Sequence, residues 1–342
     1  MPVPWRMTLG WRLLRLVDRA PVFQQPPERV RAASEARKRL VASPLTRPAV
    51  GRRAPHTVAE DATARLRDGS RLPVRIYRPA AADTTDRLPL IVNFHGGGFV
   101  AGDPRQSEWW TSSVAAGVGA IVVSVEYRLA PEHPYPAATQ DCYAATVWAV
   151  EHAAELGADP ARLAVMGDSA GANLAAVVTL IARERGGPPI ALQVLVYPVV
   201  EMVEEFPSER QYPTQPVLTK ADMDSATGLY FFGVDPALAK EEHASPLRAG
   251  HAGLPPALIQ TAEYDPLRDQ GTAYADALRA AGVAVRLTNY VDAVHGYISV
   301  PGLVPAARQA VAEAVAELRR ALSPARPQPP REQQTSIGGP VI

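Results

Sequence analysis

The sequence predicts an α/β fold in which one mostly parallel sheet is covered by helices. From about residue 72, short runs rich in β-branched residues alternate with longer alanine-rich stretches. Several short runs are apolar on both faces, which is typical of parallel strands buried between helices. The regular alternation of strand and helix indicates that successive units add to a single sheet.

Seven runs are expected to be strands, and the stretches between them supply the helices. The strands are predicted at 72–79, 88–94, 119–127, 162–168, 190–198, 256–264 and 284–291. The helices are predicted at 137–155, 170–185, 269–281 and 305–322.

Three segments fall outside this alternation. Residues 1–50 look helical, and residues 200–245 form an acidic and aromatic insertion. Both are too long for simple connections, so we expect them to form a helical cap on a domain that spans 51–322. Residues 323–342 are rich in Pro, Gln and Gly and are expected to be disordered.

Composition argues against several classes of partner. The 342 residues carry no net charge and the pI is about 7.1, so nothing favours nucleic acid binding. No apolar run approaches the ~20 residues of a membrane span. Residues 1–21 have helical apolar spacing interrupted by arginines, which favours a helix packed on the protein over a signal peptide or a membrane-surface helix. The single cysteine, Cys142, excludes an intrachain disulfide and fits a cytoplasmic location.

A candidate nucleophile lies where the strand at 162–168 meets the next helix. The residues Gly167-Asp168-Ser169-Ala170-Gly171 match the pattern G-x-S-x-G. The pattern alone is weak, since a Gly-Ser helix cap has the same letters. A strand before it and a helix after it are the setting of a nucleophile elbow, which lifts the serine hydroxyl above the sheet. Ser169 is therefore the candidate nucleophile.

A serine hydroxyl needs an adjacent base, and on such sheets the order along the chain is serine, acid, histidine. Three histidines follow Ser169, and only His295 comes just after the last predicted strand; His243 and His251 lie in polar loops before a strand. Because the carboxyl ends of parallel strands carry the chemistry of such sheets, His295 is the candidate base.

The candidate acid is Asp265, which directly follows the predicted strand at 256–264. Pro266 disfavours helix at Asp265 and keeps it in a loop. Asp269 is the rival, but we expect it to cap the next helix. Asp292 is too near His295 in the chain to have a strand end of its own.

Backbone donors for a developing negative charge are expected from two places. One is the amide of Ala170 at the start of a helix, and the other is the stretch HGGGF (95–99) after the strand at 88–94. Glycines let bare backbone approach a substrate. A plain glycine turn before a helix is the alternative interpretation of this stretch.

Five ordered stretches resemble the hormone-sensitive-lipase-like family of bacterial esterases (family IV of the α/β-hydrolases). They are HGGGFVAGD (95–103), VEYRLAPEHPYPAA (125–138), GDSAGANLAA (167–176), TAEYDPLRDQG (261–271) and VHG (294–296). The resemblance covers about residues 70 to 322. It implies the α/β-hydrolase fold, with a mostly parallel eight-stranded sheet, helices on both faces and a helical cap.

The resemblance also implies roles for residues. Ser169, Asp265 and His295 would be the catalytic triad, and Gly97, Gly98 and Ala170 the oxyanion donors. The supporting residues would be His95 and Gly96 in the glycine loop, Asp168 of the GDSAG branch, and Tyr127, Arg128 and Glu132 as buried scaffold. Ala172 replaces a glycine that is usual in the family; its methyl favours helix and can narrow the acyl side of the pocket.

The resemblance implies a serine carboxylesterase for short- to medium-chain esters, acting through an acyl-enzyme without metal or cofactor. Its partners would be a small ester and a second copy, for which the strand at 284–291 is the candidate edge. The triad leaves other acyl chemistry open, as in an amidase, lactonase, carbamate hydrolase or acyltransferase. A non-catalytic small-molecule binder is less favoured, because every triad residue is present.

Overall fold

The computed structural model describes residues 22–80, 87–215 and 217–324, and these form one eight-stranded sheet. The strands are β1 (Thr57–Arg65), β2 (Arg71–Pro79), β3 (Leu88–Phe94), β4 (Ile121–Val125), β5 (Ala158–Asp168), β6 (Leu192–Val196), β7 (Ala257–Tyr264) and β8 (Val285–Val294). Their order is β1-β2-β4-β3-β5-β6-β7-β8. Only β2 runs antiparallel to its neighbours, so the sheet is mostly parallel, as predicted.

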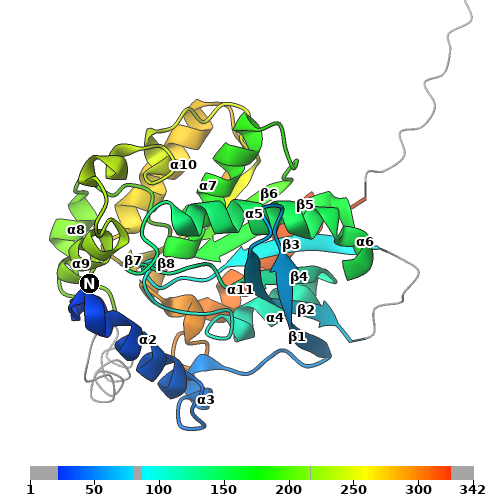
Figure 1. Cartoon of the computed structure of the whole chain (residues 1–342), viewed down its shortest axis with the longest axis horizontal. Helices are drawn as coiled ribbons and strands as arrows, with labels where there is room; N and C mark the ends of the chain where they lie inside the picture. The colour runs from blue at the N-terminus through cyan, green and yellow to red at the C-terminus, as the bar shows by residue number, and fades with distance from the viewer. Residues whose placement is uncertain (1–21, 81–86, 216, 325–342) are drawn as a thin grey trace, which may run out of the picture.

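Helices cover both faces of the sheet (Figure 1). They are α4 (Glu108–Val118), α5 (Ala137–Glu151), α6 (Ala153–Leu156), α7 (Ala170–Glu184), α10 (Arg268–Ala280) and α11 (Ala306–Ala321). Helices α5, α7 and α10 share one apolar core with the sheet, and α4 and α11 share the other. Along β5, Leu163 and Val165 enter the first core while Ala164 and Met166 enter the second. This two-sided burial explains why the central strands are continuously apolar.

The predicted strands and helices are confirmed to within a few residues, with two omissions. Strand β1 was not among the predicted runs, because as an edge strand it is half exposed and carries charged residues. Helix α4 was also not predicted. The helix expected at 137–155 is divided at His152 into α5 and α6.

Two chain segments gather at one end of the sheet, where the start of the N-terminal segment, η1, contacts α9 (Figure 1). The N-terminal segment contains η1 (Val22–Gln24), α2 (Pro27–Val41) and α3 (Arg47–Val50). The insertion contains α8 (Pro207–Gln211), α9 (Lys220–Tyr230), η2 (Pro236–Lys240) and η3 (Pro246–Arg248). Gln24 Nε2 donates to Asp222 Oδ1 at 3.0 Å, so the two segments are bonded to each other.

The division into a cap (1–50 and about 200–245) and a domain at 51–322 stays a prediction. The expected helix at 1–21 and most of the expected disordered tail, 325–342, lie outside the described residues. In the described part of the chain, every helix is too short or too polar to traverse a bilayer.

Candidate active site

Ser169 occupies a tight turn between β5 and α7. Its backbone has φ 55° and ψ −118°, a strained conformation for a residue with a side chain. A Cβ on Gly167 would lie 2.3 Å from the carbonyl oxygen of Gly171, and a Cβ on Gly171 would lie 2.0 Å from that of Phe94. Both glycines are therefore required, because the turn is pressed against the end of β3.

The structure brings the three predicted triad residues together. His295 Nε2 lies 3.0 Å from Ser169 Oγ, and His295 Nδ1 lies 2.8 Å from Asp265 Oδ2. Asp265 follows β7 and His295 follows β8, so adjacent parallel strands deliver both to the edge where Ser169 stands. Asp265 is fully buried and His295 nearly so. With its Nδ1 proton donated to Asp265, the imidazole can accept the hydroxyl proton of Ser169 at Nε2.

The rival residues are engaged elsewhere. His243 Nε2 lies 3.0 Å from Glu184 Oε2, and His251 Nε2 lies 3.1 Å from the carbonyl oxygen of Pro246. The expectation that Asp269 caps its own helix is wrong, since its carboxylate accepts the backbone N–H of Ser208 instead.

The glycine loop presents free backbone donors beside Ser169. Gly97 has φ 127° and Gly98 has φ 61°, values that favour glycine. Within the described residues, the N–H groups of Gly97 and Gly98 have no acceptor. Ala170 is the first residue of α7, where helical N–H groups lack a partner. All three residues line the same cavity as Ser169, so their amides can stabilise a negative oxygen there.

The loop is held by three side chains from outside it, those of Asp168, Gln106 and Tyr127. Gly96 N donates to Asp168 Oδ1 at 3.1 Å, and Gln106 Nε2 donates to the carbonyl oxygen of Gly96 at 2.8 Å. Tyr127 OH donates to the carbonyl oxygen of His95 at 2.6 Å, and the two rings stack at 4.3 Å. These contacts bring His95, Gly96 and Asp168 together at the glycine loop, and their supporting role stays a prediction.

Burial tunes two titratable groups behind the loop. It lowers the pKa of His95 to about 4, so the ring is neutral near pH 7 and can donate from Nδ1 to the carbonyl oxygen of Gly96 at 2.9 Å. Burial raises the pKa of Asp168 to about 6, although the Gly96 N–H and the His295 charge oppose this. His95 is fully buried and does not line the cavity that contains Ser169 and His295.

The prediction for Glu132 is wrong. Its side chain is exposed and pairs with Arg31 of α2 at 3.2 Å, because the chain reaches the surface only after the buried residues Leu129 and Ala130. Arg128 is half-exposed and binds the buried carboxylate of Asp141 on α5 at 2.7 Å. Of the three expected scaffold residues, only Tyr127 lies buried behind the glycine loop.

One residue of the site was missed. Tyr197 follows β6 with φ 37°, and its ring centre lies 4.6 Å from that of His295. The aromatic face limits where the imidazole can move. The available signal was its place at the end of the predicted strand at 190–198, since such ends carry the chemistry of parallel sheets.

A cavity of about 580 Å³ opens over the triad. Its apolar wall comes from both segments outside the sheet and includes Val22, Phe23, Leu40, Val41, Val50, Met202, Val217, Leu218 and Met223. A Cβ on Gly98 would lie 2.6 Å from the ring of Phe23, so η1 stands directly over the glycine loop. Ala172 packs in the core and does not line this cavity. Among the described residues, no cluster of His, Cys, Asp or Glu is arranged to hold a metal ion.

The fold and the site together define an α/β hydrolase. The mostly parallel sheet carries a strained serine elbow, a histidine and an acid at the ends of adjacent strands, and a glycine loop beside them. The family model described as alpha/beta hydrolase fold matches residues 91–299. Carboxylesterase NlhH of Mycobacterium tuberculosis is 45% identical over 257 residues, which cover 73% of this chain and 79% of that protein. The ethyl acetate hydrolase of Pseudomonas putida is 35% identical over 77% of this chain and 82% of its own.

Solved structures agree with these relatives. A thermostable esterase from Pseudomonas putida superposes with a TM-score of 0.84 at 36% identity, covering 94% of this chain and 98% of that one. The chain therefore belongs to the hormone-sensitive-lipase-like family of the α/β hydrolases.

Proposed function

We propose that the chain is a serine carboxylesterase. The observation that carries the proposal is the continuous line from Asp265 through His295 to Ser169, which opens into a cavity that also holds the glycine loop. The relatives named above are esterases, which favours ester hydrolysis over other acyl chemistry on the same triad.

In the first half of the reaction, Ser169 Oγ attacks the ester carbonyl carbon while His295 Nε2 takes the hydroxyl proton. Asp265 stabilises the resulting imidazolium through the Nδ1 hydrogen bond. The amides of Gly97, Gly98 and Ala170 donate to the tetrahedral oxyanion.

The second half releases the products. His295 returns its proton to the departing alkoxide, and the alcohol departs. The acyl group stays bound to Ser169 Oγ as the acyl-enzyme. A water then gives one proton to His295 and attacks the acyl carbon as hydroxide. Collapse of this second intermediate expels Ser169 Oγ, which recovers the proton from His295.

The substrate is a neutral ester with a short or medium acyl chain. A volume of about 580 Å³ suits a small ligand, and residues of the N-terminal segment and the insertion line the cavity. The apolar part of this wall suits alkyl groups.

The proposal is tested with a panel of p-nitrophenyl esters from acetate upward, with matched amides and lactones and an added alcohol to reveal acyl transfer. We expect the acetate and butyrate to be cleaved fastest, and Ser169→Ala to lose roughly 10⁴-fold or more in kcat, since the triad acts as a unit. Turnover like that of the wild type in Ser169→Ala would refute the serine mechanism. Preferential cleavage of amides or lactones would refute the ester assignment.

Two further parts of the proposal concern the whole chain. A homodimer through β8 is supported by the position of this strand at the edge of the sheet and by the exposed side chain of Val291. A cytoplasmic location is supported by the single thiol, Cys142, which is buried and unpaired. Fractionation of the native host should find the protein with cytoplasmic markers, and recovery with the cell envelope would contradict that location.

A further inference from the structure

The insertion is fastened to the turn that carries Asp265. Ser208 is the second residue of α8, and its side chain is fully buried. Its Oγ–H donates to the carbonyl oxygen of Pro266 at 2.6 Å, one residue after Asp265. Pro266 has no N–H, so its carbonyl oxygen is the only backbone group through which this residue can form a hydrogen bond.

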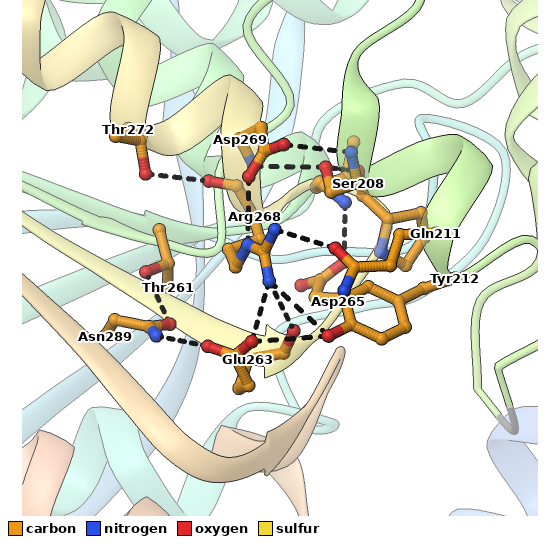
Figure 2. A network of polar contacts seen from close by, with 12 residues as sticks. Ser208, Gln211, Tyr212, Thr261, Glu263, Asp265, Arg268, Asp269, Thr272 and Asn289 are labelled. Atoms are coloured by element: carbon orange, nitrogen blue, oxygen red, sulfur yellow. Dashed lines mark hydrogen bonds and ion pairs between the residues drawn. The ribbon is translucent and has the colours of Figure 1, made fainter. Parts of the chain in front are cut away.

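The contact is reciprocal across the start of α10. Asp269 N donates to Ser208 Oγ at 3.1 Å, and Ser208 N donates to Asp269 Oδ2 at 2.9 Å. Three hydrogen bonds therefore join two segments of the chain, and the bonded pairs are 58 residues apart (Ser208 and Pro266) and 61 residues apart (Ser208 and Asp269). Figure 2 shows Ser208 and Asp269 facing each other above Asp265. We call these three bonds the Ser208 clamp.

Arg268 reinforces the clamp from the side of the sheet. It donates from Nε to Asp269 Oδ1 at 2.9 Å, from Nη1 to Glu263 Oε1 at 2.7 Å, and from Nη2 to Gln211 Oε1 at 3.0 Å. The guanidinium thus fixes the Asp269 carboxylate and the end of α8 at once, as Figure 2 shows.

Gln270 makes a second connection from the same turn of helix. Its Oε1 accepts the backbone N–H of Val200 at 2.9 Å, and its Nε2 donates to Glu209 Oε1 at 3.2 Å. Three consecutive residues after the Asp265 turn, Arg268, Asp269 and Gln270, therefore all bind the insertion. None of them takes part in the proton path from Asp265 to Ser169.

We propose that Ser208 and Asp269 are positioning residues that hold the Asp265 carboxylate against His295 through the docked insertion. On its own turn, the Asp265 carboxylate accepts Leu267 N at Oδ1 at 2.8 Å, and the Asp265 carbonyl oxygen accepts Arg268 N at 3.1 Å. The clamp adds a fixed point from outside this turn. A shift of the turn lengthens the 2.8 Å bond between Asp265 and His295 Nδ1, and that bond orients the base. The inference rests on the proposed function, because it takes Asp265 as the acid.

The test compares Ser208→Ala with Ser112→Ala. Ser112 is an equally buried serine on α4 whose Oγ also donates to one backbone carbonyl, that of Trp109, and accepts one backbone N–H, that of Ala54. Both changes remove the same kind of bonds, but Ser112 lies on the opposite face of the sheet from α7 and α10. We expect Ser208→Ala to lower kcat by about tenfold with little change in KM, while Ser112→Ala stays within about twofold.

A pH profile separates positioning from simple loss of stability. A loosened Asp265 stabilises the imidazolium less, so the acidic limb of kcat/KM should move to lower pH in Ser208→Ala and should not move in Ser112→Ala. Asp269→Ala should reproduce the shift, and Asp269→Asn should rescue part of it, because the amide oxygen still accepts Ser208 N–H while the amide NH2 cannot accept the Nε–H of Arg268. The double variant Ser208→Ala/Asp269→Ala should lose no more than the stronger single variant.

The downfield ¹H NMR resonance of His295 Nδ1–H gives a readout that needs no substrate. It should weaken or shift in Ser208→Ala and Asp269→Ala and persist in Ser112→Ala. An unmoved resonance together with an unmoved pH profile in a folded Ser208→Ala protein overturns the clamp; if that variant fails to fold, Asp269→Ala decides in the same way. Failure of the wild type to cleave any ester would refute the proposed function instead, and the resonance would still test the clamp.

Discussion

Gly98 shows at the scale of a single residue why the loop is built from bare backbone. Its φ of 61° suits glycine, its N–H has no acceptor in the described chain, and the ring of Phe23 fills the space where a Cβ would stand. A side chain here would strain the backbone and displace η1. Glycine is thus required by the backbone conformation and by the ring of Phe23, neither of which involves a substrate. The free N–H of Gly98 is the group that can donate to an oxyanion.

Removing that N–H should slow the chemical step. Gly98→Pro deletes the donor and, because proline fixes φ near −65°, also moves the loop. Gly98→Ala in a Phe23→Ala background keeps the donor and relieves the clash, so it is the matched control. We expect Gly98→Pro to lose roughly 10²–10³-fold in kcat relative to the wild type, and Gly98→Ala to lose far less relative to Phe23→Ala, the parent protein that already has the altered cavity wall. Equal losses of kcat in the two proteins would mean that backbone shape matters and the donor does not.

Asp168 gives a pH-dependent prediction for stability. Burial raises the pKa of its carboxyl to about 6, above the value of about 3.9 for an unfolded aspartate. The stability that it contributes is therefore fully present below about pH 4 and is lost as pH rises through 6. Asp168→Asn lacks this titration, so its unfolding free energy relative to the wild type should rise by roughly 2–3 kcal/mol between about pH 4 and pH 7.

Urea unfolding at several pH values measures the difference in unfolding free energy between Asp168→Asn and the wild type. The change of this difference with pH does not depend on any constant effect that the asparagine side chain has on stability. An offset that stays level from acidic to neutral pH would show that Asp168 titrates normally in the folded protein.

At the scale of elements, the sequence predicts the strands and helices whose positions are set by the local pattern of apolar residues. The central strands are apolar on both faces and end in glycine or loop residues, so their positions could be found, and with them Ser169, Asp265 and His295 at their carboxyl ends. Strand β1 could not be found, because an edge strand needs no apolar run.

The supporting contacts depend on tertiary packing that no local pattern contains. Tyr197 matters because β6 and β8 bring it against His295, and Ser208 because α8 folds back on the start of α10. Glu132 was misplaced for the same reason: its partner, Arg31, is 101 residues away in the chain. Motif order therefore locates the reacting atoms, whereas the residues that hold them need the fold.

At the scale of the whole molecule, the sheet has two edges that differ. Within residues 22–80, 87–215 and 217–324, β1 ends one side and β8 the other, and each presents a row of backbone groups that no further strand of this part of the chain pairs with. On β8, Val291 is 71% exposed and falls at an irregularity in the pairing with β7. On β1, Val58 is 48% exposed and is a matched valine on the opposite edge. A second copy that adds to β8 would continue the sheet across the dimer.

The dimer is tested by placing a charge on each edge in turn. We expect sedimentation equilibrium to show a dimer for the wild type and for Val58→Lys, and a monomer for Val291→Lys, because a lysine on an edge strand opposes the addition of another strand. Esterase activity per chain should be unchanged in both variants, since the triad of one copy is complete by itself. A wild-type protein that sediments as a monomer, or a Val291→Lys protein that stays dimeric while Val58→Lys dissociates, would remove β8 as the interface.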